Sequence, residues 1–178
     1  MKHIGWVAFA LAGVAWVQTA LLAEDKKPPP RNPFGVVDVL APDWKDVELF
    51  AATVKLPVDA KDANAAAWGM KVAEKPKSID GAWAGRWNGG SAGDKWSTGT
   101  ATIKSVGDRV YILYEEGKER WLIDAGKDGK NRLVGKYLSL QNHQDTYPWV
   151  GVVVNNERID GIWTGGRWDF RRQAEEKK

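Results

Sequence analysis

Cysteine is absent from the 178 residues of this sequence, and histidine occurs only twice. Without cysteine the protein has no disulfides and no thiolate ligands, so its fold must be stable through packing alone. A lipid anchor attached to an N-terminal cysteine is excluded for the same reason. A metal site built from several imidazole ligands is also excluded, because His143 is the only histidine beyond His3.

An excess of charge of one sign is also lacking, since 26 basic residues are balanced by 23 acidic ones and the net charge is +3. Removal of residues 1–23 takes away Lys2 and no acid, which leaves 3 − 1 = +2. A surplus this small does not create the basic field that binds nucleic acid. We therefore expect no nucleic-acid partner.

Uncharged apolar sequence is long only near the N-terminus, over residues 4–17, where it follows a lysine and a histidine. This run has the length of the apolar region of a secretory signal and is short for a membrane span. We expect residues 1–23 to be a signal peptide cleaved after Ala23, with an uncleaved N-terminal anchor as the alternative. The mature protein would have no stable membrane span and would be secreted or act in the periplasm or cell envelope. Export without cysteine is more typical of a bacterial envelope protein.

The segments that follow the signal differ in composition. Residues 24–41 contain three consecutive prolines, which predicts an extended spacer. Residues 42–77 form a partly helical arm, because apolar residues recur every three or four positions over 44–54 and an alanine-rich stretch over 59–75 predicts a second helix. The arm either packs on the main domain or, through residues 42–75, binds an envelope protein or a membrane surface.

Tryptophan and glycine are in excess, with 11 and 19 copies, and most of them fall in residues 78–172. This segment consists of strand-sized pieces separated by tight turns, and about eight such pieces fit into it. Within one of them, Val110, Ile112 and Tyr114 recur at every second position, as in a half-buried strand. We predict an all-β domain, either a small antiparallel up-and-down barrel or a strongly curved sandwich. Residues 173–178 form a charged tail.

An internal repeat marks the two ends of this domain. Residues 79–87 read Ile-Asp-Gly-Ala-Trp-Ala-Gly-Arg-Trp, and residues 159–168 repeat the pattern with one additional glycine. A closed barrel pairs its first strand with its last, so we predict that the strand of the first copy lies beside the one at 163–171. The additional glycine shifts the alternation of side chains, and we expect Gly165 and Gly166 to form a β-bulge that restores it.

Each copy places a tryptophan between two glycines: Trp83 lies between Gly81 and Gly85, and Trp163 lies between Gly161 and Gly165. Glycine at the neighbouring inward positions leaves room for the ring. We expect both tryptophans to be buried packing residues of one seam. Truncation of either one to alanine should cost about 3–5 kcal/mol.

The segment Gly81-Ala82-Trp83 resembles the Gly-x-Trp motif on the first strand of the lipocalin and avidin group of barrels, the calycins. In those families a basic residue from the end of the barrel often packs on this tryptophan, and the matching residue here would be Arg167 or Arg171. The resemblance implies the barrel architecture and the capacity for an apolar ligand. It does not imply a specific ligand.

Sequence patterns of catalysis are lacking. Ser139, His143 and Asp145 lie close together without a nucleophile elbow or an oxyanion loop, which is typical of a polar loop between strands. Residues 124–129 resemble a calcium loop, but Gly126 takes a position that needs a carboxylate or amide, so we expect a hairpin turn there. We expect no catalytic residues, no metal site and no cofactor.

The aromatic residues are better candidates for a site, because a small barrel has little room for the seven indoles of the β domain and each buried N–H needs a partner. The candidate ligand-binding residues are Trp87, Trp168, Arg86, Arg167, Tyr137 and Trp149. We expect a non-catalytic binding or interaction module that binds a glycan or a small apolar ligand. Two alternatives stay open: a structural or assembly protein with every tryptophan in the core, and an envelope hydrolase that uses a pair of carboxylates.

Overall fold

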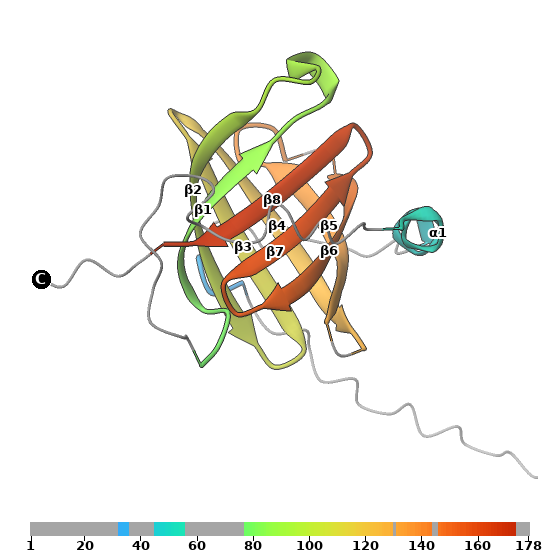
Figure 1. Ribbon diagram of the computed structural model, residues 1–178, viewed down its shortest axis with the longest axis vertical. Helices are drawn as coiled ribbons and strands as arrows, with labels where there is room; N and C mark the ends of the chain where they lie inside the picture. The colour runs from blue at the N-terminus through green and yellow to red at the C-terminus, as the bar shows by residue number, and fades with distance from the viewer. Residues whose placement is uncertain (1–31, 36–44, 56–76, 130, 144–145, 174–178) are drawn as a thin grey trace, which may run out of the picture.

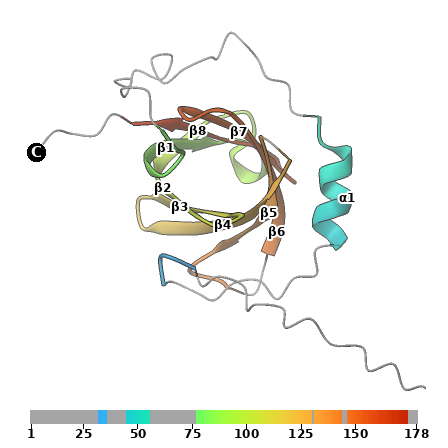
Figure 2. The same ribbon diagram turned by 90° about the horizontal axis from the view of Figure 1, so that it is seen from below.

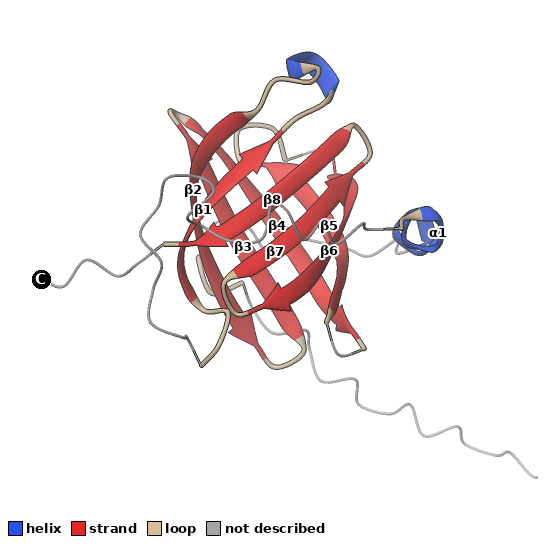
Figure 3. Ribbon diagram, in the orientation of Figure 1, coloured by secondary structure: helices blue, strands red, loops and turns tan. Residues whose placement is uncertain are grey.

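The computed structural model describes residues 32–35, 45–55, 77–129, 131–143 and 146–173, and eight β-strands within them close into one barrel. The strands are β1 (Gly81–Trp87), β2 (Ser97–Val106), β3 (Arg109–Glu116), β4 (Glu119–Asp128), β5 (Arg132–Ser139), β6 (Thr146–Asn155), β7 (Arg158–Trp163) and β8 (Gly166–Arg172). Each strand pairs antiparallel with the next, and β1 pairs with β8 (Figure 1, Figure 3). The predicted up-and-down barrel is confirmed, and so is the pairing of the first repeat copy with the end of the domain.

Side chains alternate between the interior and the outer face of the barrel, and glycines make room for the largest rings inside. Gly85 lies opposite a glycine of β2, and a Cβ at Gly85 would lie 2.7 Å from the ring of Tyr114. Gly151 lies opposite Gly161, and a Cβ at Gly151 would lie 2.3 Å from the ring of Trp149. The excess of glycine therefore has the same cause as the excess of tryptophan, since the rings occupy the space that glycine leaves.

Trp83 is fully buried in β1 and joins the start of the barrel to its end. Its Nε1 donates a hydrogen bond of 2.8 Å to the carbonyl of Ile79. The guanidinium carbon of Arg172 lies 5.7 Å from the centre of the Trp83 ring. The same guanidinium donates to the carbonyls of Ser78 and Asp80, at 2.8 and 2.5 Å. The last strand thereby fixes the segment that leads into the first one.

The basic residue beside Trp83 is thus Arg172, and the expectation of Arg167 or Arg171 is wrong. The cause is the alternation of β8: Arg172 follows Phe170 on the inward face, whereas Arg167 and Arg171 lie on the outward face.

The second repeat copy is a hairpin rather than a single strand. β7 ends at Trp163, the chain turns at Thr164 and Gly165, and β8 begins at Gly166. A two-residue connection of this kind joins adjacent antiparallel strands directly. The β-bulge expected at this position is therefore wrong, and Trp163 and Trp168 lie on neighbouring strands.

A short helix, α1 (Lys45–Thr53), packs against the outer face of β5 and β6 (Figure 2). It confirms the helix predicted over residues 44–54. Val47 of the helix is fully buried, and the outward-facing Leu138 and Val150 on the two strands are buried as well. The barrel therefore has a second apolar layer on this side.

Polar contacts hold α1 in register with the barrel. The Nζ atom of Lys136 lies 3.1 Å from the carboxylate of Asp46 in the first turn of the helix. The guanidinium of Arg132 donates a hydrogen bond to the carbonyl of Ala51 in the last turn. One cation of β5 thus pairs with a carboxylate in the first turn of the helix, and the other bonds a backbone carbonyl in the last turn.

Several expectations concern parts of the chain that the structure does not describe. The signal peptide at 1–23, the second arm helix over 59–75 and the tail beyond residue 173 lie outside the described residues, as does most of the spacer at 24–41. Within the described residues, no helix has both the length and the apolar character to cross a membrane.

Candidate functional site

A pocket of about 140 Å³ lies at the end of the barrel formed by the connections β1–β2, β3–β4, β5–β6 and β7–β8, the upper end in Figure 1. Five aromatic side chains and one serine line it: Trp87, Ser91, Trp121, Tyr137, Trp163 and Trp168. We call it the mouth pocket. The rings come from strand ends, and Ser91 comes from the short 3-10 helix Gly90–Ala92 in the β1–β2 connection. Residues from opposite ends of the domain sequence thus meet in one cavity.

The rings of the mouth pocket stand at steep angles to one another. The ring centres of Trp87 and Trp163 are 6.2 Å apart with planes at 75°, and those of Tyr137 and Trp163 are 5.9 Å apart at 89°. Trp168 meets Trp121 at 85° and Tyr137 at 75°. Edge-to-face contacts are a favoured arrangement of aromatic pairs. The rings therefore form a box rather than a flat platform.

Two of the indole N–H groups have acceptors, one on strand β3 and one in the β1–β2 connection. Nε1 of Trp87 donates to Oε2 of Glu116 at 2.7 Å, and the hydroxyl of Tyr114 donates to the same oxygen at 3.1 Å. Nε1 of Trp163 donates to the carbonyl of Asn88 at 3.2 Å. Hydrogen bonds thus fix the orientation of the Trp87 and Trp163 rings.

One of the tryptophans that line the pocket has a buried donor without an acceptor among the described residues. Nε1 of Trp168 has no hydrogen-bond partner among the described residues. Such a group costs free energy when it is buried unpaired. Burial raises the pKa of Tyr137, and the nearby Tyr147 raises it further, so the Tyr137 hydroxyl stays protonated at neutral pH. The residues that line the pocket therefore carry no charge, and one of them lacks an acceptor.

The β1–β2 and β7–β8 connections are tied together at the mouth. The backbone N–H of Gly90 donates to the carbonyl of Gly165 at 3.2 Å, and that of Asn88 donates to the carbonyl of Arg167 at 3.0 Å. A Cβ at Gly165 would lie 2.2 Å from the ring of Trp163, and one at Gly90 would lie 2.8 Å from it. The two glycines thus allow both connections to close over this ring.

Three of the predicted ligand-binding residues, Trp87, Tyr137 and Trp168, come together in the mouth pocket. Trp149 does not line it. The indole of Trp149 is fully buried in the core, 6.2 Å from the ring of Phe170. Its position against the glycines of β6 and β7 makes it a packing residue.

The two predicted arginines lie on the outer face, away from the pocket. The guanidinium groups of Arg86 and Arg167 are 3.9 and 2.9 Å from the carboxylate of Asp169. Arg86 also lies over the ring of the exposed Trp96, at 4.1 Å from its centre. Both arginines precede an inward-facing tryptophan, so strand alternation turns them outward.

The structure adds three residues to the site that the sequence did not assign to it. Trp163, expected to be buried, is half-buried and lines the pocket. Trp121 also lines it, and its alternation with the buried Ile123 could have indicated an inward position. Ser91 lies in a connection between strands, where no periodicity predicts which way a side chain points.

A cluster of buried ion pairs covers the outer face of β7 and β8. Asp160 accepts from Arg158 at 2.6 Å and lies 3.0 Å from Arg171. Asp169 lies beside it, and burial raises the pKa of its carboxyl although Arg167 and the backbone N–H of Gly161 lower it. Apart from Arg167, these groups are almost fully buried, so we assign them to the structure of the barrel wall.

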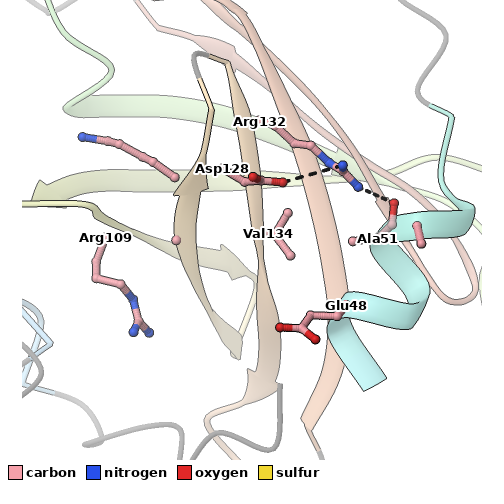
Figure 4. A pocket seen from close by; sticks show the side chains of 9 residues that line it. Glu48, Ala51, Arg109, Asp128, Arg132 and Val134 are labelled. Atoms are coloured by element: carbon pink, nitrogen blue, oxygen red, sulfur yellow. Dashed lines mark hydrogen bonds and ion pairs between the residues drawn. The ribbon is translucent and has the colours of Figure 1, made fainter. Parts of the chain in front are cut away.

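A second hollow of about 480 Å³ lies between α1 and the outer face of β4 and β5 (Figure 4). Its cations are engaged within the protein. Arg132 bonds the carbonyl of Ala51 and lies 3.6 Å from Asp128, and Lys127 donates to the carbonyl of Gly107 at 3.0 Å. We interpret this hollow as the joint between the helix and the barrel.

Of the residues weighed for catalysis, Asp145 lies outside the described residues, and Ser139 and His143 each have other contacts. His143 is exposed, with Nε2 2.7 Å from the carbonyl of Leu140, and the hydroxyl of Ser139 bonds Gln141 instead. Residues 124–129 are mostly strand, because β4 continues to residue 128 and the turn begins later than expected. Within the described residues, no group of three histidines, cysteines or carboxylates could hold a metal ion.

Searches against models of protein families, curated proteins and solved structures found no match to this chain. The fold and the pocket therefore carry the functional argument. They define a closed eight-stranded antiparallel barrel, compatible with the calycin type, with an aromatic cluster that surrounds a small cavity at one end.

Proposed function

We propose that this protein is an exported, non-catalytic binding module of calycin type that holds one small apolar group in the mouth pocket. The observation that carries the proposal is the cavity of about 140 Å³ with walls of four indoles and a phenol. An engineered apolar cavity of roughly 150 Å³ binds benzene, whereas pockets for whole drug-sized ligands span about 300–1,000 Å³. The pocket therefore suits a group of the bulk of one ring, with the rest of the ligand outside the barrel.

The calycin assignment is supported by the contact between Trp83 and Arg172. The families that Gly81-Ala82-Trp83 resembles place a basic residue of the last strand on the tryptophan of the first. Arg172 takes this position here, 5.7 Å from the ring centre. The contact lies far along the strands from the mouth pocket, so it supports the architecture and leaves the ligand open.

The geometry favours an apolar ligand over a glycan. A sugar ring stacks on a flat exposed aromatic surface, whereas the pocket rings meet at 75–89°. A purely structural role requires the rings to be buried in the core, but Trp87, Trp121 and Trp163 are only partly buried. A hydrolase with two carboxylates is disfavoured, because Glu116 is engaged by Trp87 and its neighbour Glu115 lies on the opposite face of the strand.

The proposal can be tested by NMR. The full chain is titrated with phenol, cyclohexanol or an N-acetylglucosamine oligomer, and the indole N–H signals are followed. Phenol and cyclohexanol should shift the signals of the pocket tryptophans, and the oligomer should not. Trp163→Leu should weaken phenol binding at least about tenfold. Trp96→Leu is the control, because this indole lies on the outer face. Shifts with the oligomer alone, or no shift with any probe, would contradict the proposal.

A further inference from the structure

We infer that the mouth pocket is an aromatic cage for a quaternary ammonium group. The inference rests on the proposed function and specifies the ligand class of the same site: the apolar group in the pocket is the methyl surface of a quaternary ammonium. Aromatic faces attract cations through the negative charge of their π-systems, and tryptophan is the strongest of the aromatic side chains in this respect. Four of the five rings in the pocket are indoles.

The arrangement of the rings suits a rounded cation. The pocket rings stand at 75–89° to one another and come from the five strands β1, β4, β5, β7 and β8, so a rounded group can contact several of them at once. A trimethylammonium group has a bulk similar to that of a benzene ring, so it fits a cavity of about 140 Å³. Every methyl group would then contact a ring.

The need for hydrogen-bond acceptors makes the pocket favour a quaternary ammonium over a primary one. A primary ammonium brings three N–H donors into the pocket, and each needs an acceptor. The side chains of the lining residues include two hydroxyl groups, on Ser91 and Tyr137, and no carboxylate or amide oxygen. A quaternary ammonium has no N–H, so it leaves no donor unsatisfied. Its charge is also spread over its methyl groups, which lowers the cost of removing it from water.

Other aromatic side chains of the protein already have a cation of their own. Arg86 lies 4.1 Å from the ring centre of Trp96, Arg172 lies 5.7 Å from that of Trp83, and Lys104 lies 4.7 Å from that of Phe34. Among the described residues, no lysine or arginine lies over a ring of the mouth pocket. No described lysine or arginine therefore competes with an external cation for these rings.

Glu116 adds negative charge at the wall of the cage. Its carboxylate accepts the N–H of Trp87, and a hydrogen bond to an anion increases the electron density of the indole. We regard Glu116 as a positioning residue, because it acts on the ligand through Trp87. The nearby Glu119 is exposed and faces it across the β3–β4 turn, which makes it a matched control.

The test compares choline with 3,3-dimethylbutan-1-ol, its neutral isostere, in titrations of the full chain at constant ionic strength. Choline should bind at least about tenfold more tightly than the isostere, and ethanolamine should bind more weakly than either. Trp163→Leu should weaken choline binding at least about tenfold, whereas Trp96→Leu should not change it. Near-ultraviolet circular dichroism of each variant confirms that its core is intact.

Glu116→Gln keeps an oxygen acceptor for the N–H of Trp87 and removes the charge. It should weaken choline binding and leave the affinity for the isostere unchanged. Glu119→Gln should change the affinity for neither ligand. Equal affinity for choline and the isostere would overturn the cage, and so would binding of phenol and the isostere without choline. Failure of choline, the isostere and phenol together would instead overturn the proposed function.

Discussion

At the scale of single residues, the interior of this barrel depends on glycines that give space to aromatic rings. Gly161 is the clearest case, since a Cβ there would lie 2.3 Å from the carbonyl oxygen of Trp168 and 2.6 Å from the indole nitrogen of Trp149. Neither neighbour is the end of a flexible side chain. The backbone conformation of Gly161 is ordinary for a strand, so the effect of a substitution reports on space alone.

Gly161→Ala should therefore destabilise the protein by about 1–3 kcal/mol, in the range of overpacked cores. Gly126→Ala is the matched control, because Gly126 also lies within a strand and the nearest atom to its Cβ would be 3.9 Å away. It should change stability by less than about 0.5 kcal/mol. Urea denaturation of both variants measures the difference. Equal midpoints would show that the ring of Trp149 moves at no cost.

The sequence predicts which face of a strand a side chain occupies better than it predicts how far along the barrel axis that side chain lies. Alternation correctly places Trp83 and Trp87 on the inward face, but the same pattern applies to Trp149, which is buried in the core, and to Trp163, which lines the pocket. Depth along the barrel axis is set by the register between strands, which depends on contacts between distant segments. The site could therefore be predicted as a set of tryptophans but not as a particular cavity.

At the scale of elements, two similar sequences form different structures. Residues 79–87 lead into and form one strand, whereas residues 159–168 contain a hairpin. The single additional glycine permits a two-residue turn after Trp163, so the second copy reverses direction where the first continues. The pairing of the domain ends was nevertheless predicted correctly, because barrel closure requires it whichever strand of the hairpin is last.

Helix α1 is the element whose attachment is most open to test. Val47 is 0% exposed against the barrel, whereas Leu49 on the same helix is 64% exposed. Val47→Ala should destabilise the protein by about 1–2 kcal/mol, because it removes two buried methylene equivalents at roughly 0.8 kcal/mol each. Leu49→Ala should lie within about 0.5 kcal/mol of the parent. Denaturant unfolding of the full chain measures both changes in stability. Equal losses in the two variants would mean that α1 leaves the barrel in solution.

At the scale of the whole molecule, we expect the buried carboxyl group of Asp169 on β8 to make the stability of the barrel depend on pH. Burial raises the pKa of Asp169 above its ordinary value of 3.8. Between that value and the raised pKa, the folded protein binds a proton that the unfolded chain has released. Stability contributed by this group therefore falls as the pH rises through the window. Asp124 acts in the same direction, since burial raises its pKa despite the ion pair with Arg109.

Asp169→Asn keeps an oxygen acceptor for the N–H of Gly161 and cannot ionise. The difference in unfolding free energy, parent minus variant, should therefore be largest near pH 4 and should decrease toward pH 7. Urea denaturation at several pH values measures it, and the subtraction removes titrations that both proteins share. A difference that increases with pH would mean that the ion pair with Arg167 outweighs the cost of burial.

If the proposed function holds, the two ends of the barrel divide stability from binding, because Trp83 is enclosed by backbone and Arg172 at one end while Trp163 lines the pocket at the other. Trp83→Ala should cost about 3–5 kcal/mol, as expected for the loss of a large buried ring. This is a large part of the roughly 5–15 kcal/mol of a typical domain, so Trp83→Phe serves as the milder variant.

Trp163→Leu should cost less than Trp83→Ala, because its ring is only half-buried, and should abolish most of the binding of choline and phenol. Trp83→Phe should keep both ligands. Ring contacts join Trp163 to Trp87 and Tyr137 rather than to Trp83, so the stability losses should add in the double variant to within about 0.5 kcal/mol. Urea unfolding and ligand titration on the same samples measure both quantities. Loss of ligand binding in Trp83→Phe with an unchanged midpoint would place the site at the opposite end of the barrel.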